Sequence, residues 1–114
     1  MNYQKAEENH ALLVGVSKYQ STGDKEFADL PLSKNDPKGM RTFLRQSPLK
    51  FKEENIKLLT DPTFEQYKEG LAKFESDVIV TSRKNPTTAF FSYSGHGASL
   101  EGVLHAVMPT ANIE

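Results

Sequence analysis

The chain contains the stretch Thr87-Thr88-Ala89-Phe90-Phe91-Ser92-Tyr93-Ser94-Gly95-His96-Gly97, in which an apolar, aromatic run ends abruptly in a polar turn. Such a run predicts a buried strand. The strand would deliver His96 to a surface, between two glycines that permit a sharp exit and a close approach of the backbone to a ligand. Because a histidine titrates near neutral pH, His96 can take and give protons there. The alternative is an exposed histidine in an ordinary strand-ending turn.

The first half of the chain predicts a strand, a helix and a second strand. The continuous apolar run 11–16 is typical of a central strand buried on both faces. A long polar loop should follow over residues 17–32. Asp36-Pro37 predicts a helix start with Asp36 as the cap, and Ser47-Pro48 predicts its end. Residues 56–60 predict the second strand.

A longer helix and two more strands are expected in the second half. Residues 63–66 fit a capping box, and an apolar stripe at spacings of three and four continues from there to about Ser82. The stripe places the β-branched residues 78–81 in the helix, although their propensity favours a strand. After the stretch that carries His96, residues 102–109 predict a further short strand ended by proline.

Strands that alternate with helices predict an α/β sandwich on a mainly parallel sheet. In such a sheet the ligand site is expected at the carboxyl ends of the strands, where His96 and the loop 17–32 would lie. Residues 1–10 are polar and without periodicity, and we interpret them as a flexible leader. Residues 11–114 would then form the single domain that a chain of this length allows.

Composition excludes several classes of function. The net charge is −1 and the lysines alternate with acidic residues, so neither nucleic acid nor an anionic membrane is expected as a partner. No secretory presequence and no apolar run of about 20 residues is visible, which makes the cytoplasm the default location. The chain has no cysteine, which excludes disulfides, thiolate metal sites and a cysteine nucleophile within it. His10 and His105 have no spacing that would support a metal site.

Four segments in order, residues 11–19, 32–36, 58–61 and 91–97, resemble the amino-terminal part of the caspase-like cysteine peptidases. The metacaspase and paracaspase branches are more similar than the animal caspases. The resemblance extends from about residue 11 to residue 109. It implies a caspase-like three-layer sandwich, with helices on both faces of a mainly parallel sheet. The fold would be incomplete, because the family's cysteine lies beyond the segment that corresponds to residues 108–110.

The resemblance also implies roles for individual residues. His96 matches the catalytic histidine, which works with a cysteine thiolate and protonates the leaving amine. Gly97 matches the position whose backbone N–H helps to hold the oxyanion, whereas Gly95 would serve turn geometry alone. Asp36 matches an acidic residue of the pocket for the residue before the cut, where it would bind arginine or lysine. Its role as a helix cap is an equal alternative, and Pro37, which departs from the family's pattern, favours capping.

The expected function is therefore that of a cysteine-type endopeptidase acting on a protein or peptide, with the nucleophile outside this chain. Alone, the chain should be inactive. Its partner would be the missing cysteine-bearing segment, a caspase-like partner chain, or a second copy in a homodimer. The alternative is a catalytically inactive caspase-like interaction module that acts as an adaptor or decoy. No cofactor is indicated, and calcium enters only because some metacaspases require it.

A third alternative is an unrelated small α/β ligand-binding domain in which His96 is incidental. Its weakness is that no glycine-rich phosphate-binding motif follows any of the predicted strands.

Overall fold

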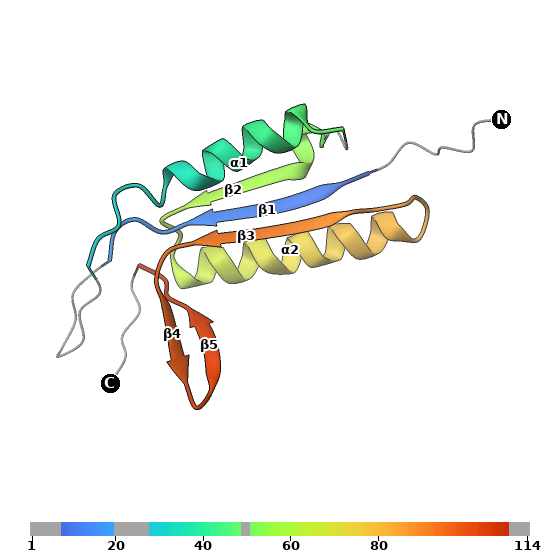
Figure 1. Ribbon diagram of the computed structural model, residues 1–114. Helices are drawn as coiled ribbons and strands as arrows, with labels where there is room; N and C mark the ends of the chain where they lie inside the picture. Colours follow the sequence, from blue (N-terminus) through green and yellow to red (C-terminus); the bar gives the residue numbers. More distant parts are fainter. Residues whose placement is uncertain (1–7, 20–27, 49–50, 110–114) are drawn as a thin grey trace.

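The computed structural model describes residues 8–19, 28–48 and 51–109 and confirms an α/β fold (Figure 1). Two helices and a three-stranded parallel sheet make up most of this part of the chain, and a two-stranded hairpin follows. The elements in chain order are β1 (His10–Gly15), α1 (Asn35–Gln46), a short 3₁₀ turn (Glu53–Asn55), β2 (Ile56–Thr60), α2 (Phe64–Ser82), β3 (Ala89–Ser94), β4 (Gly97–Leu100) and β5 (Val103–Ala106).

The parallel sheet has the strand order β2-β1-β3, with β1 in the centre. Leu13 of β1 lies opposite Leu58 of β2 and Ser92 of β3. At the carboxyl ends, Gly15 lies opposite Thr60 and Ser94 in the same way. The strand that precedes His96 therefore ends at the same edge of the sheet as its two neighbours, as the sequence predicts.

Alternate residues of β1 face the two helices, which cover opposite faces of the sheet (Figure 1). Leu12 and Val14 belong to a hydrophobic cluster against which side chains of α2 pack. Ala11 and Leu13 belong to a second cluster, which includes Leu44 of α1. Every residue of β1 is buried, because the strand is covered on both faces and paired along both edges. The three layers of the predicted sandwich are thus present.

The two helices differ in how well the sequence predicts their starts. The capping box of α2 is confirmed: Thr63 Oγ1 accepts the Gln66 backbone N–H at 3.1 Å, and Gln66 Oε1 accepts the Thr63 backbone N–H at 2.9 Å. The β-branched residues 78–81 are helical, as the apolar stripe predicts. In α1 the prediction of Asp36 as the cap is wrong. The cap position is Lys34, no side-chain hydrogen bond caps the helix, and Asp36 lies inside the first turn.

Close packing against β1 accounts for the start of α1. Pro37 is buried, and a Cβ atom added at Gly15 would lie 2.7 Å from Pro37 Cγ and from the Ser33 carbonyl oxygen. The first turn of the helix therefore rests directly on the end of the strand. Proline is tolerated there because the N–H that it lacks would have no partner within the helix.

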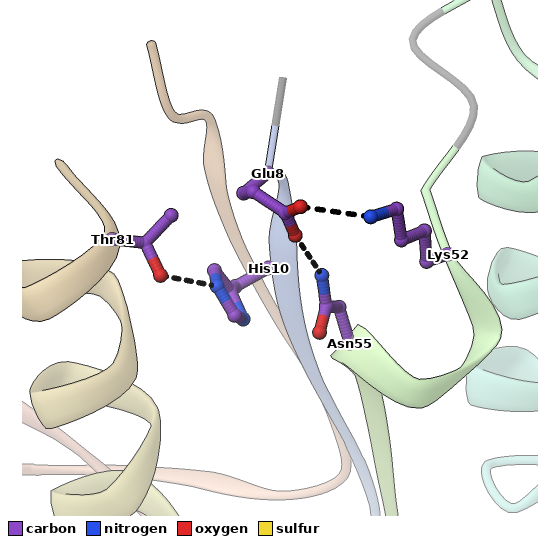
Figure 2. Close-up of polar contacts among 5 residues, drawn as sticks. All are labelled: Glu8, His10, Lys52, Asn55 and Thr81. Atoms are coloured by element: carbon purple, nitrogen blue, oxygen red, sulfur yellow. Dashed lines mark hydrogen bonds and ion pairs between the residues drawn. The ribbon is translucent and has the colours of Figure 1, made fainter. Parts of the chain in front are cut away.

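Part of the predicted leader belongs to the fold. Strand β1 begins at His10, and Asn9 is buried, where its side-chain oxygen accepts the Thr88 backbone N–H at 2.9 Å. His10 Nε2 lies 3.0 Å from Thr81 Oγ1 of α2 (Figure 2). The predicted boundary at residue 10 is therefore wrong for residues 8–10, and residues 1–7 lie outside the described part of the chain.

Strands β4 and β5 form an antiparallel hairpin that extends away from the parallel sheet (Figure 1). The sequence predicts β5 but not β4. Two residues connect the strands, Glu101 at φ 52° and Gly102 at φ 79°, which is the left-handed pair that a tight hairpin turn requires. After β5, the chain returns to the core through Val107 and Met108, which are buried in the same cluster as Leu12.

Candidate active site

His96 lies directly beyond the carboxyl end of β3, and its ring is held by a backbone carbonyl. Nε2 of the imidazole lies 2.7 Å from the Ala28 carbonyl oxygen. A carbonyl oxygen only accepts hydrogen bonds, so Nε2 carries the proton. In the neutral ring the lone pair is then on Nδ1, which is the nitrogen that can act as a base. Residue 28 belongs to the end of the predicted loop 17–32, and residues 20–27 of that loop lie outside the described residues.

Tyr19 contacts His96 through both its hydroxyl and its ring. The His96 backbone N–H donates to Tyr19 Oη at 2.7 Å. The two rings meet edge-on, with centroids 4.7 Å apart and an interplanar angle of 64°. Only 7% of Tyr19 is exposed, so the ring is fixed by the packing around it.

Tyr93, on β3, connects the His96 turn to the segment that follows the hairpin. Its Oη lies 2.7 Å from the His96 carbonyl oxygen and 2.8 Å from that of Val107, so these two acceptors share its single proton. The Val107 backbone N–H lies 3.0 Å from the His96 carbonyl oxygen and 3.2 Å from Tyr93 Oη. Burial, and then the hydrogen bond with Tyr19, raise the pKa of Tyr93 well above its usual range, so the phenol stays a neutral donor.

Gly95 provides space for these two phenols. A Cβ atom at this position would lie 2.6 Å from Tyr19 Oη and 2.6 Å from Tyr93 Oη, which are themselves 3.4 Å apart. Among the described glycines, a left-handed φ is found at Gly102 and not at Gly95. The prediction that Gly95 serves turn geometry alone is therefore wrong, because close approach of side chains excludes a larger residue.

Two carboxylates fix the backbone of the segment that carries Tyr19. Asp61 Oδ1 accepts the backbone N–H groups of Ser17 at 2.7 Å and Lys18 at 3.1 Å. Asp29 Oδ1 accepts the Tyr19 backbone N–H at 2.9 Å. Asp61 has φ 49°, a left-handed conformation that aspartate tolerates better than most residues. In the sequence Asp61 is noted within the segment 58–61 that resembles the family, and these long-range contacts carry no sequence signal.

The structure brings Asp36 to the edge of the sheet that carries His96. Asp36 Oδ2 accepts a hydrogen bond from Ser94 Oγ at 2.6 Å, and Ser94 is two residues before His96. The Asp36 side chain comes from the first turn of α1 and is exposed at the surface. Its proposed contact with a basic substrate side chain stays a prediction.

Gly97 is exposed and begins β4, where it lies opposite Ala106. A Cβ atom at Gly97 would lie 3.0 Å from Leu104 Cδ1, so a larger residue would displace that side chain. The role of the Gly97 N–H at an oxyanion stays a prediction. His105 is exposed on β5. Among residues 8–19, 28–48 and 51–109, no three His, Cys, Asp or Glu side chains are placed to hold a metal ion.

These observations define an α/β protein in which a histidine is fixed by hydrogen bonds directly beyond the carboxyl end of a parallel strand. In the described part of the chain, neither helix is long and apolar enough to cross a membrane. A family model described as the caspase domain matches residues 8–112, and the chain belongs to this family, peptidase C14. No curated protein and no solved structure matches the chain. With no cysteine, the chain does not contain the nucleophile of this peptidase family.

Proposed function

We propose that this chain supplies the histidine half of a caspase-type cysteine endopeptidase, of metacaspase-like specificity for arginine or lysine before the cut. The cysteine would come from a segment outside these 114 residues or from a caspase-like partner chain. The observation that carries the proposal is the hydrogen bond from His96 Nε2–H to the Ala28 carbonyl, because it gives the imidazole one defined tautomer at the strand end.

The chemistry assigns the proton transfers to His96 Nδ1 and the binding of the oxyanion to the Gly97 backbone. Nδ1 of His96 takes the proton of the cysteine thiol, and the thiolate attacks the carbonyl carbon of the scissile peptide. The carbonyl electron pair moves to oxygen, where the Gly97 backbone N–H donates a hydrogen bond. When the intermediate collapses, the imidazolium returns the proton to the leaving amine and an acyl-enzyme forms. Water, deprotonated by Nδ1, then hydrolyses the thioester.

The outer edge of β3 supports the proposal that the cysteine arrives on an added strand. Within the described residues β3 pairs with β1 alone, so its other edge is open to pairing. Beside it, Phe91 is 45% exposed, and an apolar groove of about 320 Å³ is lined by Phe74, Glu75, Val78, Ile79 and Ala89. A strand added parallel to β3 would end at the same edge as His96, where its last residue could reach the imidazole.

The complete lack of cysteine favours a second candidate function, a catalytically inactive interaction module. In that case the same edge of β3 would bind a caspase-like partner, or a second copy of the chain, and regulate it without taking part in chemistry.

Coexpression of this chain with a caspase-like protein that carries a cysteine distinguishes the two functions. Complex formation is measured by size-exclusion chromatography, and activity by cleavage of peptides with arginine, lysine or aspartate before the cut. Cleavage after arginine or lysine that neither chain achieves alone is the result expected for the peptidase. Binding without cleavage would support the adaptor and contradict the peptidase. Absence of both binding and cleavage would contradict both functions.

A further inference from the structure

We propose that Tyr19 is a positioning residue for His96, whose hydroxyl holds the backbone and whose ring sets the direction of the imidazole. The consequence for catalysis rests on the proposed function, whereas the positioning itself is a property of this chain alone.

In addition to the contacts of its carbonyl oxygen, His96 is fixed at its backbone N–H, at its ring and at Nε2. Its backbone N–H donates to Tyr19 Oη, its ring packs edge-on against the Tyr19 ring, and its Nε2–H donates to the Ala28 carbonyl. Rotation of the imidazole would break the bond to Ala28, and the Tyr19 ring occupies the space beside it. Tyr19 is therefore placed to determine where Nδ1 is presented.

Tyr19 is itself held rigidly. Its backbone N–H donates to Asp29 Oδ1, and its buried hydroxyl lies 3.4 Å from Tyr93 Oη. Leu30, the residue after Asp29, is also hydrogen-bonded to the segment before Tyr19, because its backbone N–H donates to the Ser17 carbonyl at 2.6 Å. The phenol and the Ala28 carbonyl thus belong to one hydrogen-bonded unit, so movement of one moves the other.

The hydroxyl and the ring of Tyr19 have separable effects. Tyr19→Phe keeps the ring packing and removes the acceptor, which leaves the His96 N–H without this partner. Tyr19→Leu removes both contacts. Tyr67→Phe is the matched control, because Tyr67 packs on the same hydrophobic cluster from α2 and loses the same single oxygen.

The first test measures the isolated chain by NMR. In Tyr19→Phe, amide hydrogen exchange at His96 should be faster by about five- to tenfold, as expected for the loss of one hydrogen bond. Tyr67→Phe should exchange at the wild-type rate. Unchanged exchange at His96 in a folded Tyr19→Phe variant would overturn the proposal. If that variant does not fold, nuclear Overhauser contacts between the two rings in the wild-type chain decide, and their absence overturns it.

The second test measures kinetics in the complex with the cysteine-bearing partner. Tyr19→Phe should lower kcat by about tenfold with KM nearly unchanged, and Tyr19→Leu should lower kcat further. A rise in KM of about tenfold with constant kcat would overturn the positioning role, because that pattern indicates lost substrate binding. If the wild-type complex cleaves nothing, the proposed peptidase function fails, and the NMR result still decides the role of Tyr19.

Discussion

The turn that carries His96 is assembled from side chains that are distant in sequence. Tyr19 follows β1, Tyr93 lies on β3, and their hydroxyls meet over Gly95. Each hydroxyl bonds to a different backbone group of His96, the N–H in one case and the carbonyl in the other. The orientation of the His96 imidazole therefore depends on how the segment after β1 packs against β3, and on the absence of a side chain at Gly95.

Substitution of Gly95 tests this packing at the scale of one methyl group. Gly95→Ala should lower the free energy of unfolding by about 1–3 kcal/mol, because the added Cβ would overlap the phenolic oxygens of Tyr19 and Tyr93. Gly39→Ala is the control: no atom lies within 4 Å of its Cβ in α1, and alanine should stabilise the helix by roughly 0.5–1 kcal/mol. Urea denaturation measures both, and equal stability of Gly95→Ala and the wild type would contradict the packing.

Asp36 is tested through substrate preference. In the complex with the cysteine-bearing partner, Asp36→Asn should lower kcat/KM for arginine peptides by about 10- to 100-fold, because a charge-assisted hydrogen bond is lost. Asp77→Asn on α2, whose carboxylate pairs with Lys73 at 3.3 Å, should leave that value unchanged. A similar decrease in both variants would show that Asp36 does not bind the substrate side chain.

At this scale the sequence predicts the position of His96 at a strand end better than the contacts around it. His96 is marked by an apolar run that ends between glycines, which is a local pattern. The Ala28 carbonyl that fixes its tautomer is a backbone atom, and no side-chain pattern reports it. Tyr19 is 77 positions away, so only the folded chain brings it to His96.

Among the elements, β1 organises the fold because both other sheet strands pair with it and both helices pack on it. The sequence predicts β2 with both bounds correct, and Asp61-Pro62 marks its end. It does not predict β4, a four-residue strand whose glycine and serine have a low strand propensity. The start of α1 is also missed, because packing against β1 determines it rather than a local cap.

The beginning of β1 is attached to the segment before β2 by an ion pair. Glu8 Oε1 lies 2.8 Å from Lys52 Nζ, and Glu8 Oε2 accepts a hydrogen bond from Asn55 Nδ2 at 3.2 Å (Figure 2). The hydrogen bonds from Lys52 and then Asn55 lower the pKa of Glu8. Both partners precede β2, so the pair connects the amino-terminal ends of the two strands.

This ion pair predicts a loss of stability in acid. A carboxyl group whose pKa is lower in the folded than in the unfolded protein stabilises the folded state at pH values above its unfolded pKa, about 4.3. This stabilisation is lost as the pH falls through the pKa of the folded state. Wild-type chain should therefore be more stable than Glu8→Gln at pH 7, and the difference should shrink by pH 3. Denaturation of both proteins across this range measures it, with Glu75→Gln on exposed α2 surface as the control. A difference that is constant with pH would contradict the prediction.

For the whole molecule, the alternation of strands and helices predicts the fold class, and the order of four segments predicts the family. Those properties follow from hydrophobic periodicity and motif order, which a single sequence carries. The origin of a nucleophile does not follow, because the chain itself has no cysteine. Within the described residues one edge of β3, next to His96, is unpaired, and this edge supports the proposed function.

The proposed function requires His96 to act with a cysteine supplied from outside this chain. The most direct measurement compares His96→Ala with His105→Ala in the complex with a cysteine-bearing partner, using an arginine peptide. Both variants remove an imidazole, and His105 is exposed on β5. We predict that His96→Ala lowers the cleavage rate by at least about 100-fold while His105→Ala cleaves at the wild-type rate. Cleavage by His96→Ala at the wild-type rate would contradict the claim.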